Sequence, residues 1–190
     1  MFVLEARNER IVILVLTILM AATRIEHFGM GQLAPDASVA IFFLAGLLIA
    51  NPLWLAAFIV EAMLLDLTAI QVVGVESVCV TLGYGLMIPA FGSLWLAGRF
   101  ARDSERLGAA TVAKLVSACV VGIIGFFVFS NIGYYLGGGF DSSMGLAEYA
   151  RRVMRYFPYY LTIGLSYSAV GVAIVAIASR VGLKGRLAPR

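Results

Sequence analysis

Residues 112–129 read VAKLVSACVVGIIGFFVF, an apolar run interrupted by a single charge at Lys114. A run of this length and composition predicts a helix that crosses a lipid bilayer. The rest of the 190-residue chain has the same character, because 62% of its residues are hydrophobic and only 13% are charged. A soluble globule of this composition would expose more apolar surface than water tolerates. The sequence therefore predicts an all-α integral membrane protein.

Similar stretches lie on both sides of this run, and together they predict six transmembrane helices, at residues 10–28, 37–50, 52–67, 79–98, 111–130 and 158–180. The first is expected to be a retained helix and not a cleaved signal peptide, because no small-x-small cleavage pattern follows it. Pro52 separates the second from the third, since a proline suits the first turn of a helix. These two are shorter than the roughly 20 residues of a full crossing. They either extend through their polar flanks or form a hairpin that does not cross completely.

The breaks between the apolar runs are short, so residues 1–190 are expected to form a single transmembrane domain. The basic residues lie in these breaks instead of forming a stripe, which argues against nucleic acid as a partner. With six crossings, ten of the fourteen basic residues share one side: Arg7, Arg10, Arg99, Arg102, Arg106, Lys114, Arg180, Lys184, Arg186 and Arg190. Such an excess marks the cytoplasmic side. We therefore expect both termini in the cytoplasm.

The opposite, external ends of the expected helices carry unusually many polar residues at membrane depth. Intramembrane polar groups are costly and commonly functional, which favours a binding site that opens outward. The candidates are Arg24, Glu26, His27, Asp66, Cys79, Tyr84 and Arg152. Each has a plainer interpretation beside the functional one. His27 would also serve as a hydrogen-bonded cap, and Tyr159 and Tyr160 are typical of an interfacial aromatic belt.

The two cysteines, Cys79 and Cys119, form no CxxC motif, and the single histidine excludes a histidine cluster. A structural metal is therefore not expected. Cys119 lies in the middle of an apolar run, where cysteine is usually a small packing residue. Cys79 lies at the external mouth of the fourth expected helix, where packing and function are equally compatible with it. A disulfide between them is not expected, because their depths differ by several turns.

The chain resembles the BtuM family of cobalamin transporters, which are related to the substrate-binding S-components of energy-coupling factor (ECF) transporters. Three segments carry the resemblance: RIEHF at residues 24–28, Asp66, and VESVCVTLGY at residues 75–84. It implies a six-helix S-component-like bundle in a bacterial inner membrane, with cobalamin bound at the external side. One departure concerns the first helix, where ILMAATRI at residues 18–25 lacks the Ala-x-x-x-Ala pattern for docking an energising module. Vitamin binding is thus better supported than docking of that module, and it stays open whether the chain completes transport with an ECF module or alone.

The resemblance further implies that the Cys79 thiolate is an axial ligand of the cobalt, since cysteine is the softest ligand here. It would then labilise an upper cyanide ligand, so that a transporter would also perform a decyanation. His27, Asp66, Tyr84 and Arg152, with Glu26 and Arg24, would meet the rim amides, the nucleotide loop or its phosphate. Arg152 suits the phosphate because a guanidinium offers a bidentate fork. No nucleotide-binding motif is present, so any use of ATP requires a partner.

Two alternatives remain at the level of sequence. The chain would bind another vitamin, a flavin or thiamine, with Tyr84, Tyr134 and Tyr135 stacked on its ring. Otherwise it is a membrane enzyme with Cys79 as the nucleophile, although no general base pairs with Cys79 in sequence. Colour separates these cases: a bound corrinoid is pink to red and a flavin is yellow, whereas an enzyme without a cofactor is colourless.

Overall fold

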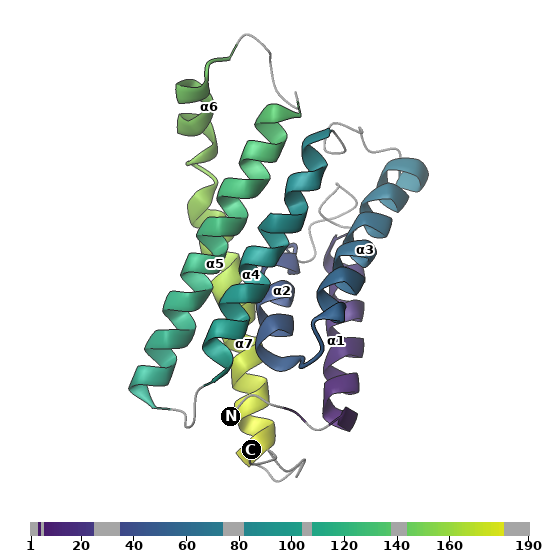
Figure 1. The fold of residues 1–190 in the computed structure, drawn as a ribbon, viewed down its shortest axis with the longest axis vertical. Helices are drawn as coiled ribbons and strands as arrows, with labels where there is room; N and C mark the ends of the chain where they lie inside the picture. Colours follow the sequence, from purple (N-terminus) through teal and green to yellow (C-terminus); the bar gives the residue numbers. More distant parts are fainter. Residues whose placement is uncertain are drawn as a thin grey trace.

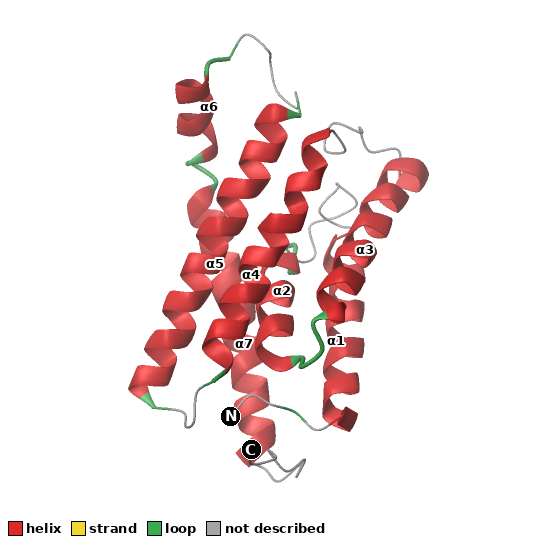
Figure 2. Ribbon diagram, viewed as in Figure 1, coloured by secondary structure: helices red, strands yellow, loops and turns green. Residues whose placement is uncertain are grey.

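The computed structural model describes residue 4 and residues 6–24, 35–73, 82–103, 108–137 and 144–180. Every element in these ranges is helical, as predicted (Figures 1 and 2). The elements in chain order are α1 (Ala6–Arg24), α2 (Ser38–Leu48), α3 (Leu53–Thr68), the π-helical η2 (Ala69–Val73), the 3-10 helix η4 (Leu82–Leu86), α4 (Met87–Arg102), α5 (Ala109–Leu136), α6 (Leu146–Val153) and α7 (Phe157–Arg180).

A helix coincides with each of the six predicted ranges, and α6 is an additional helix that lies outside them. Three helical stretches in the described part of the chain are long and apolar enough to cross a membrane, namely Leu53–Val72, Ala109–Leu136 and Phe157–Ala178. They agree with the prediction of a membrane protein. The stretch Leu53–Val72 is longer than predicted because η2 continues α3 without a break, and α5 extends the apolar run at 111–130 at both ends.

The short helix α2 forms the centre of the bundle. All eleven of its residues are buried, and it contacts α1, α3, α4, α5 and α7. A helix that is apolar on every side is stable only when it is enclosed. At a rise of 1.5 Å per residue α2 is about 16 Å long, roughly half of the hydrocarbon thickness of a bilayer. The second predicted range is therefore a core helix that other helices surround.

Close contact between the backbones of α2 and α4 depends on two glycines. A Cβ atom on Gly98 would lie 2.1 Å from the carbonyl oxygen of Phe43, and one on Gly46 would lie 2.1 Å from that of Trp95. Small residues permit this approach, which is common between membrane helices. It brings the rings of Phe42 and Phe91 into a stack with centroids 4.0 Å apart.

Two arginines at the end of α4 bind the backbone carbonyls that follow α2. Arg99 donates to the carbonyl oxygens of Ile49 and Ala50 at 3.1 and 2.8 Å, and Arg102 donates to that of Ile49 at 3.0 Å. The last carbonyls of a helix lack partners within the helix, so these bonds act as a C-terminal cap. Arg99 and Arg102 were predicted from sequence as topology signals alone. In the structure they also fasten α2 to α4.

The start of α1 and the end of α7 lie at the same end of the bundle, the lower end in Figure 1. The beginning of α3, the end of α4 and the beginning of α5 lie at this end too, whereas α6 lies at the opposite end. The helices thus alternate in direction along the bundle. The start of α1 and the end of α7 therefore share one end of the bundle, and the assignment of this end to the cytoplasm stays a prediction.

A cysteine introduced at Ser104, between α4 and α5, tests that topology. In a Cys79→Ser/Cys119→Ser background, we expect an impermeant thiol reagent to label Ser104→Cys in inside-out vesicles and not in intact cells. The reason is that most basic residues gather on the side of residue 104. Labelling in intact cells would place this end outside and would overturn the predicted orientation.

Candidate functional site

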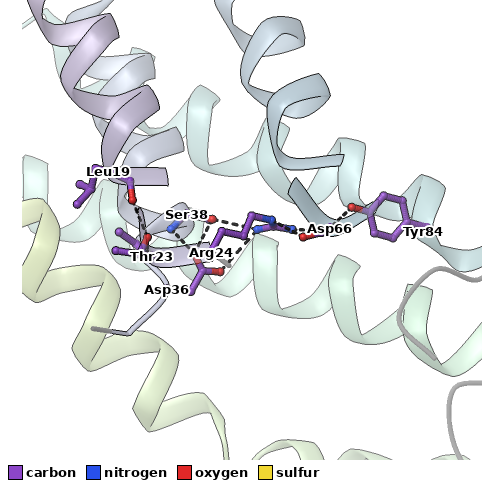
Figure 3. A network of polar contacts seen from close by, with 8 residues as sticks. Leu19, Thr23, Arg24, Asp36, Ser38, Asp66 and Tyr84 are labelled. Carbon is purple, nitrogen blue, oxygen red and sulfur yellow. Dashed lines mark hydrogen bonds and ion pairs between the residues drawn. The ribbon is translucent and has the colours of Figure 1, made fainter. Parts of the chain in front are cut away.

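A buried polar network lies at the end of the bundle opposite to the start of α1, and it joins three elements (Figure 3). Its members are Arg24, the last residue of α1, Asp66 near the end of α3, and Tyr84 in η4. The exposed fractions of Arg24 and Asp66 are 7% and 4%. Charges are buried to this extent only when they are paired. The network therefore unites three residues that the sequence placed separately at the ends of helices.

The central contact is a two-pronged ion pair between Arg24 and Asp66. Nε of Arg24 donates to Oδ1 of Asp66 at 2.6 Å, and Nη2 donates to Oδ2 at 2.7 Å. This parallel geometry is the strongest form of arginine–carboxylate contact. Tyr84 also donates its hydroxyl hydrogen to Oδ2 of Asp66. The carboxylate of Asp66 thus accepts three hydrogen bonds, and the two from the guanidinium fix the plane of the carboxylate.

Two further residues hold the other side of the guanidinium. Nη1 of Arg24 donates to Oγ of Ser38 at 2.9 Å and lies 3.6 Å from Oδ2 of Asp36. Oδ1 of Asp36 accepts the backbone N–H of Ser38 at 2.9 Å and its hydroxyl at 2.6 Å. An aspartate two residues before a bound N–H at the start of a helix is a common turn. The Asp-x-Ser spacing at residues 36–38 is the sequence signal from which Ser38 could have been identified.

Arg24 is held in place by its own helix as well. Thr23 donates to the carbonyl oxygen of Leu19 at 2.9 Å, and its hydroxyl oxygen accepts the backbone N–H of Ala37 at 3.2 Å. These bonds attach the stretch before α2 to the end of α1. The guanidinium carbon of Arg24 also lies 5.7 Å from the centroid of the Phe91 ring, at cation–π distance. The side chain consequently has little freedom to turn into the cavity beside it.

The network forms one wall of a partly open cavity of about 370 Å³. Arg24, Asp36, Asp66 and Tyr84 lie on this wall. Tyrosines from α5, α6, the turn after α6 and α7 supply much of the remainder: Tyr134, Tyr149, Tyr156, Tyr159 and Tyr160. A cavity of this size, mainly apolar with a few convergent polar groups, is typical of small-molecule sites. Tyr159 and Tyr160, which the sequence left open as an interfacial belt, both line it.

Tyr149 closes the cavity on the side of α6. It donates its hydroxyl hydrogen to the carbonyl oxygen of Asn131 at 2.9 Å, and its ring centroid lies 5.0 Å from that of Tyr135. Burial, and then the neighbouring Tyr134 and Tyr160, raise the pKa of Tyr149 to about 12. The phenol therefore remains neutral at physiological pH. Tyr149 was missed in the sequence because it lies outside the six apolar runs, between charged residues.

Of the four other predicted candidates, only Arg152 is among the described residues. Cys79, His27 and Glu26 lie outside the described residues. Arg152 is on α6, where its exposed side chain pairs with Glu148 at 2.9 Å, and it does not line the cavity. Tyr135, proposed with Tyr84 and Tyr134 to stack on an aromatic ring, packs on Tyr149 instead of lining the cavity.

Cys119 is buried, with an exposed fraction of 3%. Its Sγ lies 3.6 Å from Oγ of Ser168, between α5 and α7. This position agrees with the packing role predicted for it. Among the described residues no group of three or more His, Cys, Asp or Glu could hold a metal ion.

The Arg24–Asp66–Tyr84 network and the tyrosine-lined cavity beside it make up the candidate site. No protein-family model matches this chain, and no curated protein does.

Proposed function

We propose that this chain is a six-span, S-component-like membrane protein that binds cobalamin at the external side of a bacterial inner membrane and mediates its uptake. The observation that carries the proposal is the cavity at the end of the bundle opposite to the start of α1, with Arg24, Asp66 and Tyr84 on one wall. These three residues belong to the segments that resemble the BtuM family. Their convergence from α1, α3 and η4 supports a common role in ligand binding.

The charges on this wall favour a ligand that donates hydrogen bonds. Asp36 and Asp66 carry two negative charges against the single positive charge of Arg24, so the wall has an excess of carboxylate. The rim of a corrinoid carries carboxamides, whose N–H groups are suitable donors. The tyrosines opposite supply flat apolar surface together with hydroxyl groups. Both walls therefore match parts of a corrinoid.

A corrinoid is larger than a cavity of 370 Å³, so it would fill the cavity in part and extend through the open side. His27 is three positions after Arg24, and Cys79 is five positions before Tyr84. An extended chain spans at most about 3.6 Å per residue, which limits these distances to about 11 and 18 Å. The length of chain therefore permits Cys79 and His27 to reach a ligand bound in the cavity. Arg152 would meet only a part of the ligand that extends past α6.

In the proposed binding step, the thiolate of Cys79 takes one axial position of the cobalt. The dimethylbenzimidazole that normally fills the lower position is then displaced, and the bound vitamin is base-off. A strongly donating thiolate labilises the opposite ligand, so an upper cyanide departs as cyanide ion with its electron pair. This is a ligand exchange that leaves the oxidation state of the cobalt unchanged. Any ATP hydrolysis that energises uptake would come from a partner, such as an ECF module.

A second candidate ligand is a smaller vitamin, a flavin or thiamine. The observations that favour it are the cavity volume, which suits a compact ligand, and the tyrosines that offer stacking surfaces. In that case Cys79 has no part in binding. The wall with excess carboxylate suits the cationic ring of thiamine as well as an amide.

The absorption spectrum of protein purified from cells grown with cobalamin distinguishes these candidates. We expect a pink to red preparation whose corrin bands are shifted from those of free cyanocobalamin. Cys79→Ser should abolish the shift, because a serine hydroxyl is a hard and far poorer cobalt ligand than a thiolate. Cys119→Ser is the matched control and should preserve it, since Cys119 is buried between α5 and α7.

The same spectra contain the contrary results. Equal corrin bands in wild type and Cys79→Ser would remove Cys79 from the cobalt. A yellow preparation would indicate a flavin. A colourless preparation that does not take up added cobalamin would overturn the cobalamin proposal as a whole.

A further inference from the structure

The helix α6 has two chemically opposite faces. Successive residues of an α-helix are turned by about 100°, which gathers residues three and four apart on one face. One face of α6 and the turn after it is apolar, with Leu146, Tyr149, Ala150, Val153 and Met154. The other face is charged, with Glu148, Arg151, Arg152 and Arg155. Neither Arg151 nor Arg155 lines the proposed vitamin cavity.

The charged face contains two arginines without a counter-charge. Arg151, Arg152 and Arg155 line a common hollow of about 460 Å³ together with Glu148 and Tyr156. Glu148 pairs with Arg152, with Oε1 and Nη2 2.9 Å apart. Within the described part of the chain, neither Arg151 nor Arg155 has an acidic group within ion-pair distance. The hollow is therefore suited to an anion.

The apolar face of α6 borders a groove of about 420 Å³ against the end of α5. The residues of α5 that line it are Phe127, Val128, Asn131, Ile132, Tyr135 and Leu136. They extend over ten residues, or about 14 Å along the helix axis. Figure 1 shows α6 beside this end of α5, so the groove follows the direction of the bundle. Its lining is apolar, and Val128 and Ile132 are 45% and 44% exposed.

We propose that this end of the molecule binds one anionic phospholipid, with its phosphate against Arg151 and Arg155 and an acyl chain in the groove between α5 and α6. Guanidinium groups bind phosphate through paired hydrogen bonds. Arg151 lies about 60° around the helix from Met154, which lines the groove, so the anionic and apolar parts of the site meet at the edge between the two faces.

Two features favour a lipid over a soluble phosphate. The groove next to the arginines is apolar. It offers no favourable contact to a free anion, whereas it removes an acyl chain from water. Arg151, Arg152 and Arg155 also lie on the side that the charge distribution predicts as external, where basic residues are otherwise few. An anionic lipid headgroup explains why three of them gather there. The proposal does not depend on the identity of the vitamin.

Native mass spectrometry of the full chain, released from detergent with an equimolar mixture of phosphatidylglycerol and phosphatidylcholine of identical acyl chains, tests the proposal. We expect the wild type to retain one phosphatidylglycerol in preference to phosphatidylcholine. Arg151→Gln/Arg155→Gln should lower the affinity for phosphatidylglycerol about tenfold or more, because each basic residue near a headgroup contributes substantially. Ala150→Trp fills the groove from an exposed position and should reduce retention with both arginines intact.

The matched control is Arg7→Gln/Arg10→Gln, which removes two exposed arginines of α1 at the opposite end. It should leave retention of phosphatidylglycerol unchanged. Equal retention of the two lipids by the wild type would overturn the proposal, as would an equal loss in the control variant. Displacement of phosphatidylglycerol by glycerol phosphate at the same concentration would reduce the site to an anion site without an acyl chain and would also overturn it. Melting temperatures in the same detergent show whether each variant is folded.

Discussion

Gly98→Ala is expected to destabilise the protein by about 3 kcal/mol or more, because the added methyl group meets a backbone that cannot move aside. The new Cβ would lie 2.1 Å from the carbonyl oxygen of Phe43 and 2.8 Å from the backbone nitrogen of Leu47. Both atoms belong to α2, which is enclosed on all sides. The helices must therefore separate, which opens the stack of Phe42 on Phe91. A loss of this size corresponds to a fall in melting temperature of roughly 10 °C.

Gly92→Ala, on the same helix α4, is the matched control. A Cβ atom there has no neighbour within 4 Å. Alanine favours a helix over glycine by about 1 kcal/mol, so this variant should be neutral or slightly stabilised. The same glycine-to-alanine substitution is thus expected to lower the stability at position 98 and to leave it unchanged or raise it slightly at position 92. The measurement is the melting temperature in detergent, with the fluorescence of the buried Trp95 as a report on the α2–α4 contact. An equal effect of Gly92→Ala and Gly98→Ala would contradict the close approach of the backbones.

The helices could be predicted from the sequence because each is a continuous apolar run, and such runs are recognised by composition and length alone. The same criterion cannot distinguish a helix that faces lipid from one that faces protein. The range 37–50 was therefore expected as a short span or half of a hairpin, although all of α2 is buried within the bundle. The helix α6 was missed because its apolar residues are interleaved with charges, at helical spacing and over eight residues only.

The candidate site was partly predictable. Arg24, Asp66 and Tyr84 each stood out as a polar residue at the end of an apolar run. Their mutual contacts depend on how α1, α3 and η4 pack together, and this cannot be deduced from spacing. Arg152 was grouped with them because it lies on the predicted external side and a guanidinium suits a phosphate. In the structure Arg152 is exposed on α6 and pairs with Glu148, and it does not line the cavity.

The buried ion pair leads to the second large effect: Arg24→Leu is expected to destabilise the protein by about 3–5 kcal/mol, the usual result of removing one partner of a buried pair. It leaves the carboxylates of Asp36 and Asp66 without their shared cation, and it deprives Ser38 of a donor. Asp66→Asn should cost less. Arg24 then keeps Asp36 as a counter-charge, and an amide oxygen still accepts one hydrogen bond. The melting temperature in detergent without ligand should therefore be highest for the wild type, lower for Asp66→Asn and lowest for Arg24→Leu.

Glu148→Ala provides the comparison, since it removes the acidic partner of Arg152 from a pair whose side chains are 53% and 60% exposed. An exposed pair four residues apart on a helix contributes well under 1 kcal/mol, so this variant should melt close to the wild type. The double variant Arg24→Leu/Asp66→Leu completes the test, because it removes both charges. Its loss of stability should be smaller than the sum of the losses in Arg24→Leu and Asp66→Leu, because the effects of substituting two residues in direct contact do not add. Additive losses, or an Arg24→Leu variant as stable as Glu148→Ala, would mean that Arg24 and Asp66 do not form the buried pair that bounds the cavity. The vitamin site would then have to be sought without this wall.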